Sequence, residues 1–167
     1  LASEKQFIDF SSSYFEGNSS ELGALGYSRD QQPGKLQVTW GISTGDNEIP
    51  TAITIQKGNV CDKEHFKFML NTVKKVLDEK SLLIFDCGGN TKKNKNKIIE
   101  LGFNYLTLKA KQRSTYQKYI SLFEQQAKFG CFINGKVYFY TKTKSEEEYQ
   151  YIFFSPDLKE DQIRKRS

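Results

Sequence analysis

The sequence predicts an α/β protein with a mixed sheet, in which antiparallel strands come first and parallel strands follow. Residues 7–15, 36–43 and 51–56 alternate apolar and polar side chains and are joined by glycine-containing links, which is typical of an antiparallel meander. Residues 62–80 then place apolar side chains at helical spacing, and residues 81–86 form a short apolar run of strand length. This change of period predicts parallel strands joined by helices in the second part of the sheet.

The next elements complete this first region, which we assign to residues 1–109. A short helix is expected over residues 94–101 and ends at Gly102. A further strand is expected over residues 103–108, so the predicted order is three strands, a helix, a strand, a helix and a strand. Asp62 is expected to cap the first of the two helices.

The character of the chain changes after this region. Residues 110–167 contain an amphipathic stretch over residues 114–129, which predicts a helix. A hairpin follows, because Asn134 and Gly135 separate two β-rich arms. Residues 149–154 predict a third strand. We therefore expect a second region made of a helix, a β-hairpin and a strand.

The composition excludes several classes of protein. The 167 residues are 37% hydrophobic and 14% aromatic, which is enough for a core and argues against disorder. No apolar run approaches the roughly 18 residues that span a bilayer, and we expect no signal peptide in the first residues. The three cysteines fit neither a zinc spacing nor a disulfide framework. We expect reduced thiols in a cytoplasmic protein.

Two acidic residues lie where metal chemistry is expected. Asp9 stands among apolar residues inside the first predicted strand, and Asp86 ends the apolar run of the fourth. Carboxyl ends of parallel strands face the functional crevice of a sheet, so the two carboxylates meet if these strands are neighbours. A divalent cation such as Mg²⁺ would remove their repulsion, and paired ions support phosphodiester chemistry. The alternative is that each aspartate only ends or caps its element.

Five segments of the first region carry a family resemblance. In chain order they are FIDFSSSYFEG, LGALGYSRD, PGKLQVTWGIS, IPTAITIQKGNVCD and LLIFDCGGNTKKN. Together they resemble insertion-sequence transposases of the DDE type. The catalytic core of that family has a ribonuclease H-like fold interrupted by a β-rich insertion, and residues 110–167 would be part of this insertion.

The resemblance implies an activity and a site. Asp9 would be the first catalytic acid and Asp86 the second, and both would bind Mg²⁺ or Mn²⁺. The third acid of the family, a Glu on a helix with Tyr, Arg and Lys around it, has no counterpart after Asp86. Cys87 also stands where relatives usually have Arg. We therefore expect a fragment that ends before the last catalytic helix, binds metal weakly and is inert or nearly so alone.

The complete enzyme would be a nucleotidyl transferase that cleaves phosphodiester bonds at transposon ends and joins the 3′-hydroxyl to target DNA. The resemblance implies double-stranded DNA as partner, prokaryotic nucleoid-associated localisation, and action as a homodimer or larger DNA complex. Basic residues indicate where DNA would bind, although each lysine cluster has the alternative of a solvated face, and Arg29 that of an ion pair with Asp30. The candidates are Arg29, Lys92, Lys93, Lys95, Lys97, Lys109, Lys111 and Arg113.

Two other functions compete with this one. A non-catalytic DNA-binding module with a degenerate nuclease fold would suit the missing third acid and the net charge of +5. A phosphatase-like hydrolase would use Asp86 as nucleophile, but the second acid usual two residues later is replaced by Gly88. Divalent-metal titration separates the first alternative from the transposase.

Other residues are expected to have structural roles. His65 is assigned to the surface or to helix packing, Trp40 to the core, and Glu16 to a loop contact. The aromatic residues at 138–140 and 149–154 either fill a sheet face or stack on nucleic-acid bases.

Overall fold

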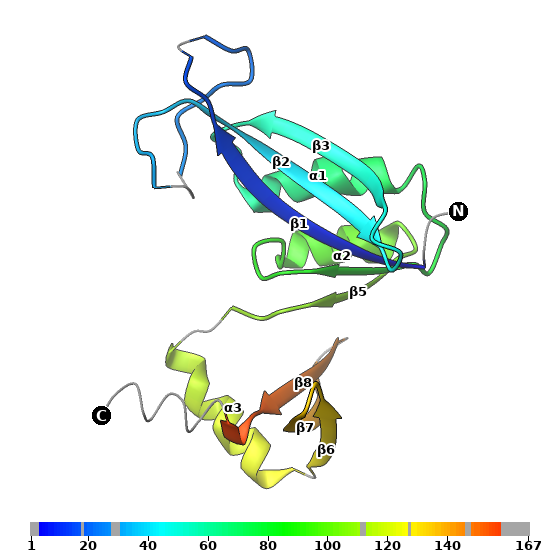
Figure 1. Ribbon diagram of the computed structural model, residues 1–167. Coiled ribbons are helices and arrows are strands. Elements are labelled where there is room, and N and C mark those ends of the chain that lie inside the picture. The colour runs from blue at the N-terminus through cyan, green and yellow to red at the C-terminus, as the bar shows by residue number, and fades with distance from the viewer. Residues whose placement is uncertain are drawn as a thin grey trace. The chain divides into compact units, whose positions relative to one another are not determined.

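The computed structural model divides the chain into two compact units, Leu1–Ala110 and Lys111–Ser167 (Figure 1). The residues that the structure describes are 4–17, 19–27, 31–110, 113–126, 128–145 and 148–157.

The first unit contains a five-stranded mixed sheet with strand order β3-β2-β1-β4-β5 (Figure 1). β1 pairs antiparallel with β2, and β2 with β3, whereas β1 pairs parallel with β4, and β4 with β5. The mixed sheet, antiparallel first and parallel afterwards, is therefore confirmed. The strands are β1 (Lys5–Tyr14), β2 (Gln37–Gly45), β3 (Pro50–Lys57), β4 (Leu82–Phe85) and β5 (Asn104–Thr107).

Two helices, α1 (Asp62–Val73) and α2 (Lys92–Glu100), cover one face of this sheet (Figure 1). Phe66 of α1 lies between the sheet residues Phe10 and Phe85, with ring centroids 5.9 Å and 4.6 Å away. Aromatic rings at these separations pack favourably, and burying each side chain stabilises the fold by about 1.5–3 kcal/mol. The core residues are Ile8, Phe10, Ala52, Phe66, Met69, Leu70, Val73, Leu77, Leu83, Phe85, Ile98 and Phe103.

The first helix is shorter than the 62–80 expected, because α1 ends at Val73. Leu77 still reaches the core from the following turn, which explains the helical spacing of the apolar residues. Lys80 has a positive φ of 70°, and its amide donates to the carbonyl of Gly102 at 2.7 Å. This turn returns the chain to the sheet, so a helix that continued to residue 80 would not allow β4 to begin at Leu82.

The side of β2 that faces the helices is the polar one, contrary to expectation. Gln37, Thr39 and Ser43 are buried, whereas Trp40 lies half-buried on the opposite face. The assignment of Trp40 to the core is therefore wrong. Its indole N–H donates to Ser13 Oγ at 3.1 Å, on the side of the sheet that α1 and α2 do not cover.

Hydrogen bonds explain why polar residues can lie beneath the helices. Thr39 Oγ1 is 3.2 Å from Nδ1 of His65, whose Nε2 is 2.8 Å from Thr54 Oγ1. Ser43 Oγ donates to Gln6 Oε1 at 2.9 Å. Buried polar groups that find such partners avoid the cost of desolvation. Periodicity shows which residues share a face, but not which face the helices cover.

The second face of the sheet carries apolar side chains that remain exposed. Phe7 of β1 is 45% exposed, and Ile53 of β3 and Leu106 of β5 are 60% and 51% exposed. Strand registers place these residues on the face that also carries Asp9, because Asp9 pairs with Ile42 and Ile42 with Ile53. Both helices of the unit lie on the other side.

The second unit consists of α3 (Arg113–Gln125) and a three-stranded antiparallel sheet with order β6-β7-β8. Asn134 and Gly135 have φ values of 49° and 77°, as a type I′ hairpin turn requires, so the predicted hairpin is confirmed. α3 packs on the sheet through Phe123 and Phe154, whose ring centroids are 5.6 Å apart. The strands are β6 (Phe129–Ile133), β7 (Lys136–Ser145) and β8 (Glu148–Phe154).

All three cysteines are free. Among the described helices, none has the length and apolar character required to cross a membrane.

Candidate functional site

Asp9 and Asp86 follow two residues that are partners in the parallel pair of β1 and β4. Ile8 is in register with Phe85, and both side chains are buried beneath the helices. Asp9 and Asp86 are the next residues on these two neighbouring strands, which lie about 4.8 Å apart. Both aspartates are exposed. The first and fourth strands are therefore neighbours, which is the condition on which the predicted pair of acids depends.

Local backbone amides orient both carboxylates. Asp9 Oδ1 accepts a hydrogen bond from the amide of Phe10 at 2.8 Å. Asp86 Oδ1 accepts one from the amide of Gly88, also at 2.8 Å. The Oδ2 atoms of both have no hydrogen-bond partner among the described residues, which leaves an oxygen on each side chain for an external cation.

The turn after Asp86 brings another carboxylate close. A Cβ atom on Gly88 would lie 2.8 Å from Asp62 Oδ2 and 3.0 Å from Asp86 Oδ1, so both oxygens flank this glycine. Asp62 is the first residue of α1, the N-cap is Cys61, and no side chain caps the helix. The expectation that Asp62 is the N-cap is therefore wrong, because its backbone is already helical. Sequence reasoning missed its place beside Asp86.

Asn94 holds the same turn from beneath. This buried residue of α2 donates through Nδ2 to the carbonyl of Gly89 at 3.0 Å and to that of Lys63 at 3.1 Å. Thr107 Oγ1 donates to the carbonyl of Asp86 at 2.9 Å. A Cβ atom on Gly89 would lie only 2.8 Å from the Phe66 ring. The backbone that carries Asp86 is thus fixed from α1, α2 and β5.

The carboxylates suit a hard cation but do not complete a site. Mg²⁺ and Mn²⁺ prefer oxygen ligands, and one or two carboxylates with water and phosphate commonly hold Mg²⁺. Within the described ranges, no three His, Cys, Asp or Glu side chains are grouped so that they could hold a metal ion. Of the later acids, Glu124 and Glu148 belong to the second unit. Glu146, Glu147 and Glu160 lie outside the described residues.

The lysines of the first unit differ in their surroundings. Lys92 and Lys93 are exposed in the first turn of α2, shortly after the Asp86 turn. Lys97 instead pairs with Glu100 at 2.7 Å, and Lys95 Nζ lies 6.0 Å from the centre of the Tyr105 ring. The first two are therefore the better candidates of this cluster for a phosphate.

Lys109 follows β5 and is exposed. Because β4 and β5 are parallel, it leaves the sheet at the same edge as Asp86, and Asn90 Nδ2 ties the two turns by donating to Leu108 O at 2.9 Å. Arg29 and Lys111 lie outside the described residues. Arg113 begins α3 in the second unit, and its side chain also falls outside the described part.

His65 has a packing role. Its ring is fully buried, lies 4.9 Å from the Phe10 ring and contacts two threonine hydroxyls, so the helix-packing alternative holds and the surface alternative does not. Burial lowers the pKa of His65, and the nearby Asp62 carboxylate opposes this shift. Glu16 also behaves as expected, because it pairs with Lys35 at 2.5 Å in the loop region.

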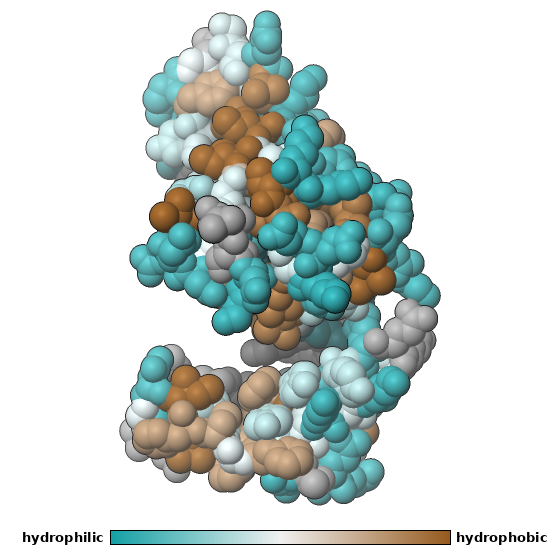
Figure 2. All heavy atoms as spheres, turned by 90° about the vertical axis from the view of Figure 1, so that its right-hand side faces the viewer, coloured by the Kyte–Doolittle hydropathy of each residue, from teal (hydrophilic) through white to brown (hydrophobic). Residues whose placement is uncertain are grey.

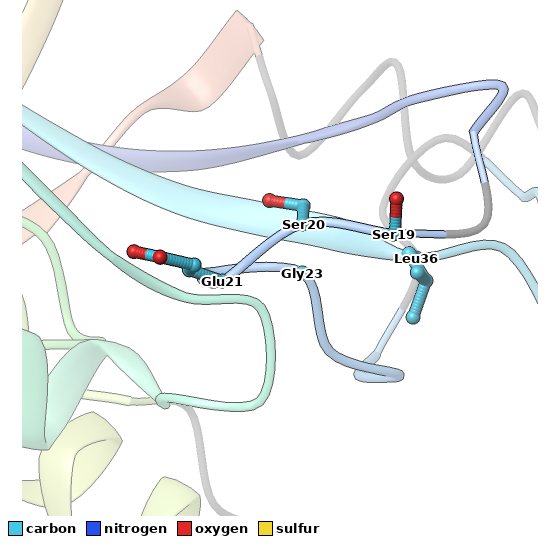
Figure 3. A pocket seen from close by; sticks show the side chains of 5 residues that line it. All are labelled: Ser19, Ser20, Glu21, Gly23 and Leu36. Atoms are coloured by element: carbon cyan, nitrogen blue, oxygen red, sulfur yellow. The ribbon is translucent and has the colours of Figure 1, made fainter.

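A shallow hollow near the β1–β2 loop is lined by few groups that could bind or react with a ligand. Its lining includes a single ionisable side chain, that of Glu21, among serine, glycine and leucine (Figure 3). It therefore offers no group of acids comparable to the Asp86 turn. The lining residues are Ser19, Ser20, Glu21, Gly23 and Leu36.

Comparison with known proteins gives a likeness of fold. No protein-family model matches the sequence, and no curated protein is significantly similar to it. The structure is similar to that of a piggyBac transposase, solved by cryo-EM as a synaptic complex with hairpin DNA, with a TM-score of 0.54 and 11% sequence identity. The match covers 92% of this chain and 33% of that one. The chain therefore has a transposase-like fold and spans about a third of the length of that transposase.

Proposed function

We propose that this chain is part of the catalytic core of a DNA transposase of the DDE type, with a ribonuclease H-like sheet and a β-rich insertion. The observation that carries the proposal is the register of Ile8 with Phe85, because each is followed by one of the two aspartates on neighbouring strands of a mixed sheet. The similarity of the fold to a piggyBac transposase supports it. The family resemblance of the sequence also implies that these two aspartates are the first and second catalytic acids.

Asp9 and Asp86 would hold Mg²⁺ or Mn²⁺. When bound, such an ion activates a water or a 3′-hydroxyl and stabilises the leaving oxygen in phosphodiester cleavage and strand transfer. Backbone amides would orient both carboxylates for this role, because each amide holds one Oδ1 atom and leaves Oδ2 for the cation. Since the described residues supply no third ligand, we expect weak metal binding by this chain.

Double-stranded DNA is the partner that the surrounding lysines would favour. Lys92, Lys93 and Lys109 are exposed next to the turns that leave β4 and β5. Lysines at such positions can neutralise phosphates, and binding that depends on them weakens as salt rises. The duplex would thus lie across the edge of the sheet that carries the acids.

A second candidate is a DNA-binding module whose nuclease site has degenerated. The observation in its favour is that no third metal-ligating side chain lies with the two aspartates in the described part of the chain. The two proposals predict the same duplex affinity, but they differ in whether the aspartates bind metal.

Calorimetric titration of the chain with Mn²⁺ distinguishes the catalytic core from the degenerate DNA-binding module. We expect weak binding that Asp9→Asn and Asp86→Asn each reduce at least tenfold. Asp78→Asn removes an exposed carboxylate elsewhere in the same unit and should leave the affinity unchanged. Equal affinity in all four proteins, or no binding at all, would contradict the catalytic proposal, and duplex binding that persists would then favour the degenerate module.

A further inference from the structure

The sheet of the second unit has two different faces. α3 packs on one of them, where Phe154 contacts Phe123 and the buried Thr141 donates to Gln126 Oε1 at 3.1 Å. Partners in an antiparallel register share a face and successive residues alternate, so the strand pairings identify the members of the other face. We name this the outer face: Phe129, Cys131, Ile133, Lys136, Tyr138, Tyr140, Lys142, Lys144, Tyr149, Tyr151 and Phe153.

Aromatic rings form a connected group on the outer face, with Tyr140 at its centre. The Tyr140 ring lies 5.4 Å from Phe129 in a stacked arrangement, 5.5 Å from Phe153 and 6.2 Å from Tyr151. Phe129, Tyr151 and Phe153 are 51%, 45% and 59% exposed. Hydrophobic side chains also reach the surface among hydrophilic ones in Figure 2. The outer face is thus an aromatic surface rather than a buried layer.

Lysines accompany these rings. Lys142 Nζ lies 4.1 Å from the centre of the Tyr149 ring and 5.7 Å from that of Tyr151, and Lys144 Nζ lies 5.8 Å from that of Tyr149. The strand acid Glu148 pairs with Ser145 and so falls on the α3 side. Among the described strand residues, the outer face therefore carries positive charge and no carboxylate.

We propose that the outer face binds single-stranded DNA, with bases stacked on Phe129, Tyr140, Tyr149 and Phe153 and phosphates near Lys142 and Lys144. Single-stranded nucleic acid presents π-faces and a negative backbone together, and both features match this surface. A purely apolar partner would leave the two ammonium groups desolvated. A base in an intact duplex is stacked on its neighbours and cannot meet these rings face to face, so the surface favours an unpaired strand.

This surface is separate in the chain from the two aspartates, and the inference does not rest on their binding metal. It adds a site for an unpaired strand to the duplex site proposed for the first unit. Loss of one site should leave the other intact, because they belong to different compact units.

Fluorescence anisotropy of a labelled oligo(dT) with the 167-residue chain tests the proposal. Tyr149→Ala, Phe153→Ala and Lys142→Ala should each weaken binding by roughly tenfold, given the contribution of one stacked base or contacted phosphate. Tyr116→Ala and Lys118→Ala are matched controls on α3. Tyr116 is 57% exposed and Tyr149 59%, so they differ in place rather than in exposure. The controls should bind like the wild type.

Three results would overturn the proposal. The first is wild-type affinity in all three outer-face variants, with circular dichroism showing that they are folded. The second is a duplex or an oligo(U) binding at least tenfold more tightly than oligo(dT) through the same residues. The third is a self-association, measured by sedimentation, that Tyr149→Ala abolishes while oligo(dT) binding is unchanged, which would assign the surface to a second copy.

Discussion

Ile8 of β1 and Phe85 of β4 are partners in a parallel strand pair, and each is followed by an aspartate. Both partners point into the core beneath the helices. A slip of one residue would exchange the faces of all side chains on a strand, so burial of this pair locks the register. That Asp9 and Asp86 follow one paired position on neighbouring strands is therefore a consequence of core packing.

Phe85→Ala should destabilise the chain by about 3–5 kcal/mol, because Phe85 is buried and packs 4.6 Å from the Phe66 ring. Urea unfolding followed by circular dichroism measures this change. Phe132→Ala is the matched control, since Phe132 is 73% exposed, and we expect a change within about 0.5 kcal/mol. Similar losses in both variants would contradict the described core.

Gly89→Ala should destabilise the turn after β4 by about 1–3 kcal/mol, because the new methyl group would lie 2.8 Å from the Phe66 ring. Gly17→Ala adds the same group where nothing lies within 4 Å, so it should be neutral or slightly stabilising. Thermal unfolding of the two variants side by side gives the comparison. A Gly89→Ala protein as stable as Gly17→Ala would show that the turn is not as tightly packed as described.

Asn94→Ala should cost about 1–3 kcal/mol of unfolding free energy, because it leaves the carbonyls of Gly89 and Lys63 without their side-chain donor. It should also weaken Mn²⁺ binding, since Asn94 holds the turn that carries Asp86. Asn96→Ala removes an exposed amide from the same helix and should change neither quantity much. If a folded Asn94→Ala protein bound Mn²⁺ with unchanged affinity, the turn that Asn94 holds would not contribute to the metal site.

The chain should lose stability as the pH falls below about 6.5, the ordinary pKa of histidine. Burial lowers the pKa of His65 in the folded chain, so the unfolded chain takes up the proton first. The free energy of unfolding should therefore have its full value above that pH. As the pH falls further, this free energy should decrease until the pH reaches the lowered pKa of His65. Urea unfolding between pH 5.5 and 7.5 measures it. Because the chain has one histidine, His65→Gln should flatten this dependence, and an unchanged slope would refute the assignment.

Strand alternation and turn chemistry predicted the order of the elements, the mixed sheet and the Asn134-Gly135 hairpin, because these features depend on neighbours in the chain. They did not predict that the polar side of β2 is the buried one. That outcome depends on bonds from Thr39 to His65 and from Ser43 to Gln6, which join distant segments. Local pattern cannot supply such pairings.

The candidate site could be predicted only in part from the sequence. Asp9 and Asp86 stand out because an acid within or just after an apolar strand is unusual. The adjacency of their strands was only a condition of the sequence analysis, and the structure supplies it. The proximity of Asp62 and the role of Asn94 were not predictable. Both depend on how α1 and α2 approach the turn after β4, which is a property of the packed structure.

The central claim is that Asp9 and Asp86 bind one divalent cation together. Paramagnetic broadening of backbone amide signals by Mn²⁺, in the isotope-labelled chain, tests it most directly. We expect substoichiometric Mn²⁺ to broaden the signals of Asp9, Asp86 and Ile42, the cross-strand partner of Asp9, and Asp9→Asn to abolish the effect. Broadening centred on other residues, or equally strong broadening around residue 86 in Asp9→Asn, would contradict the claim.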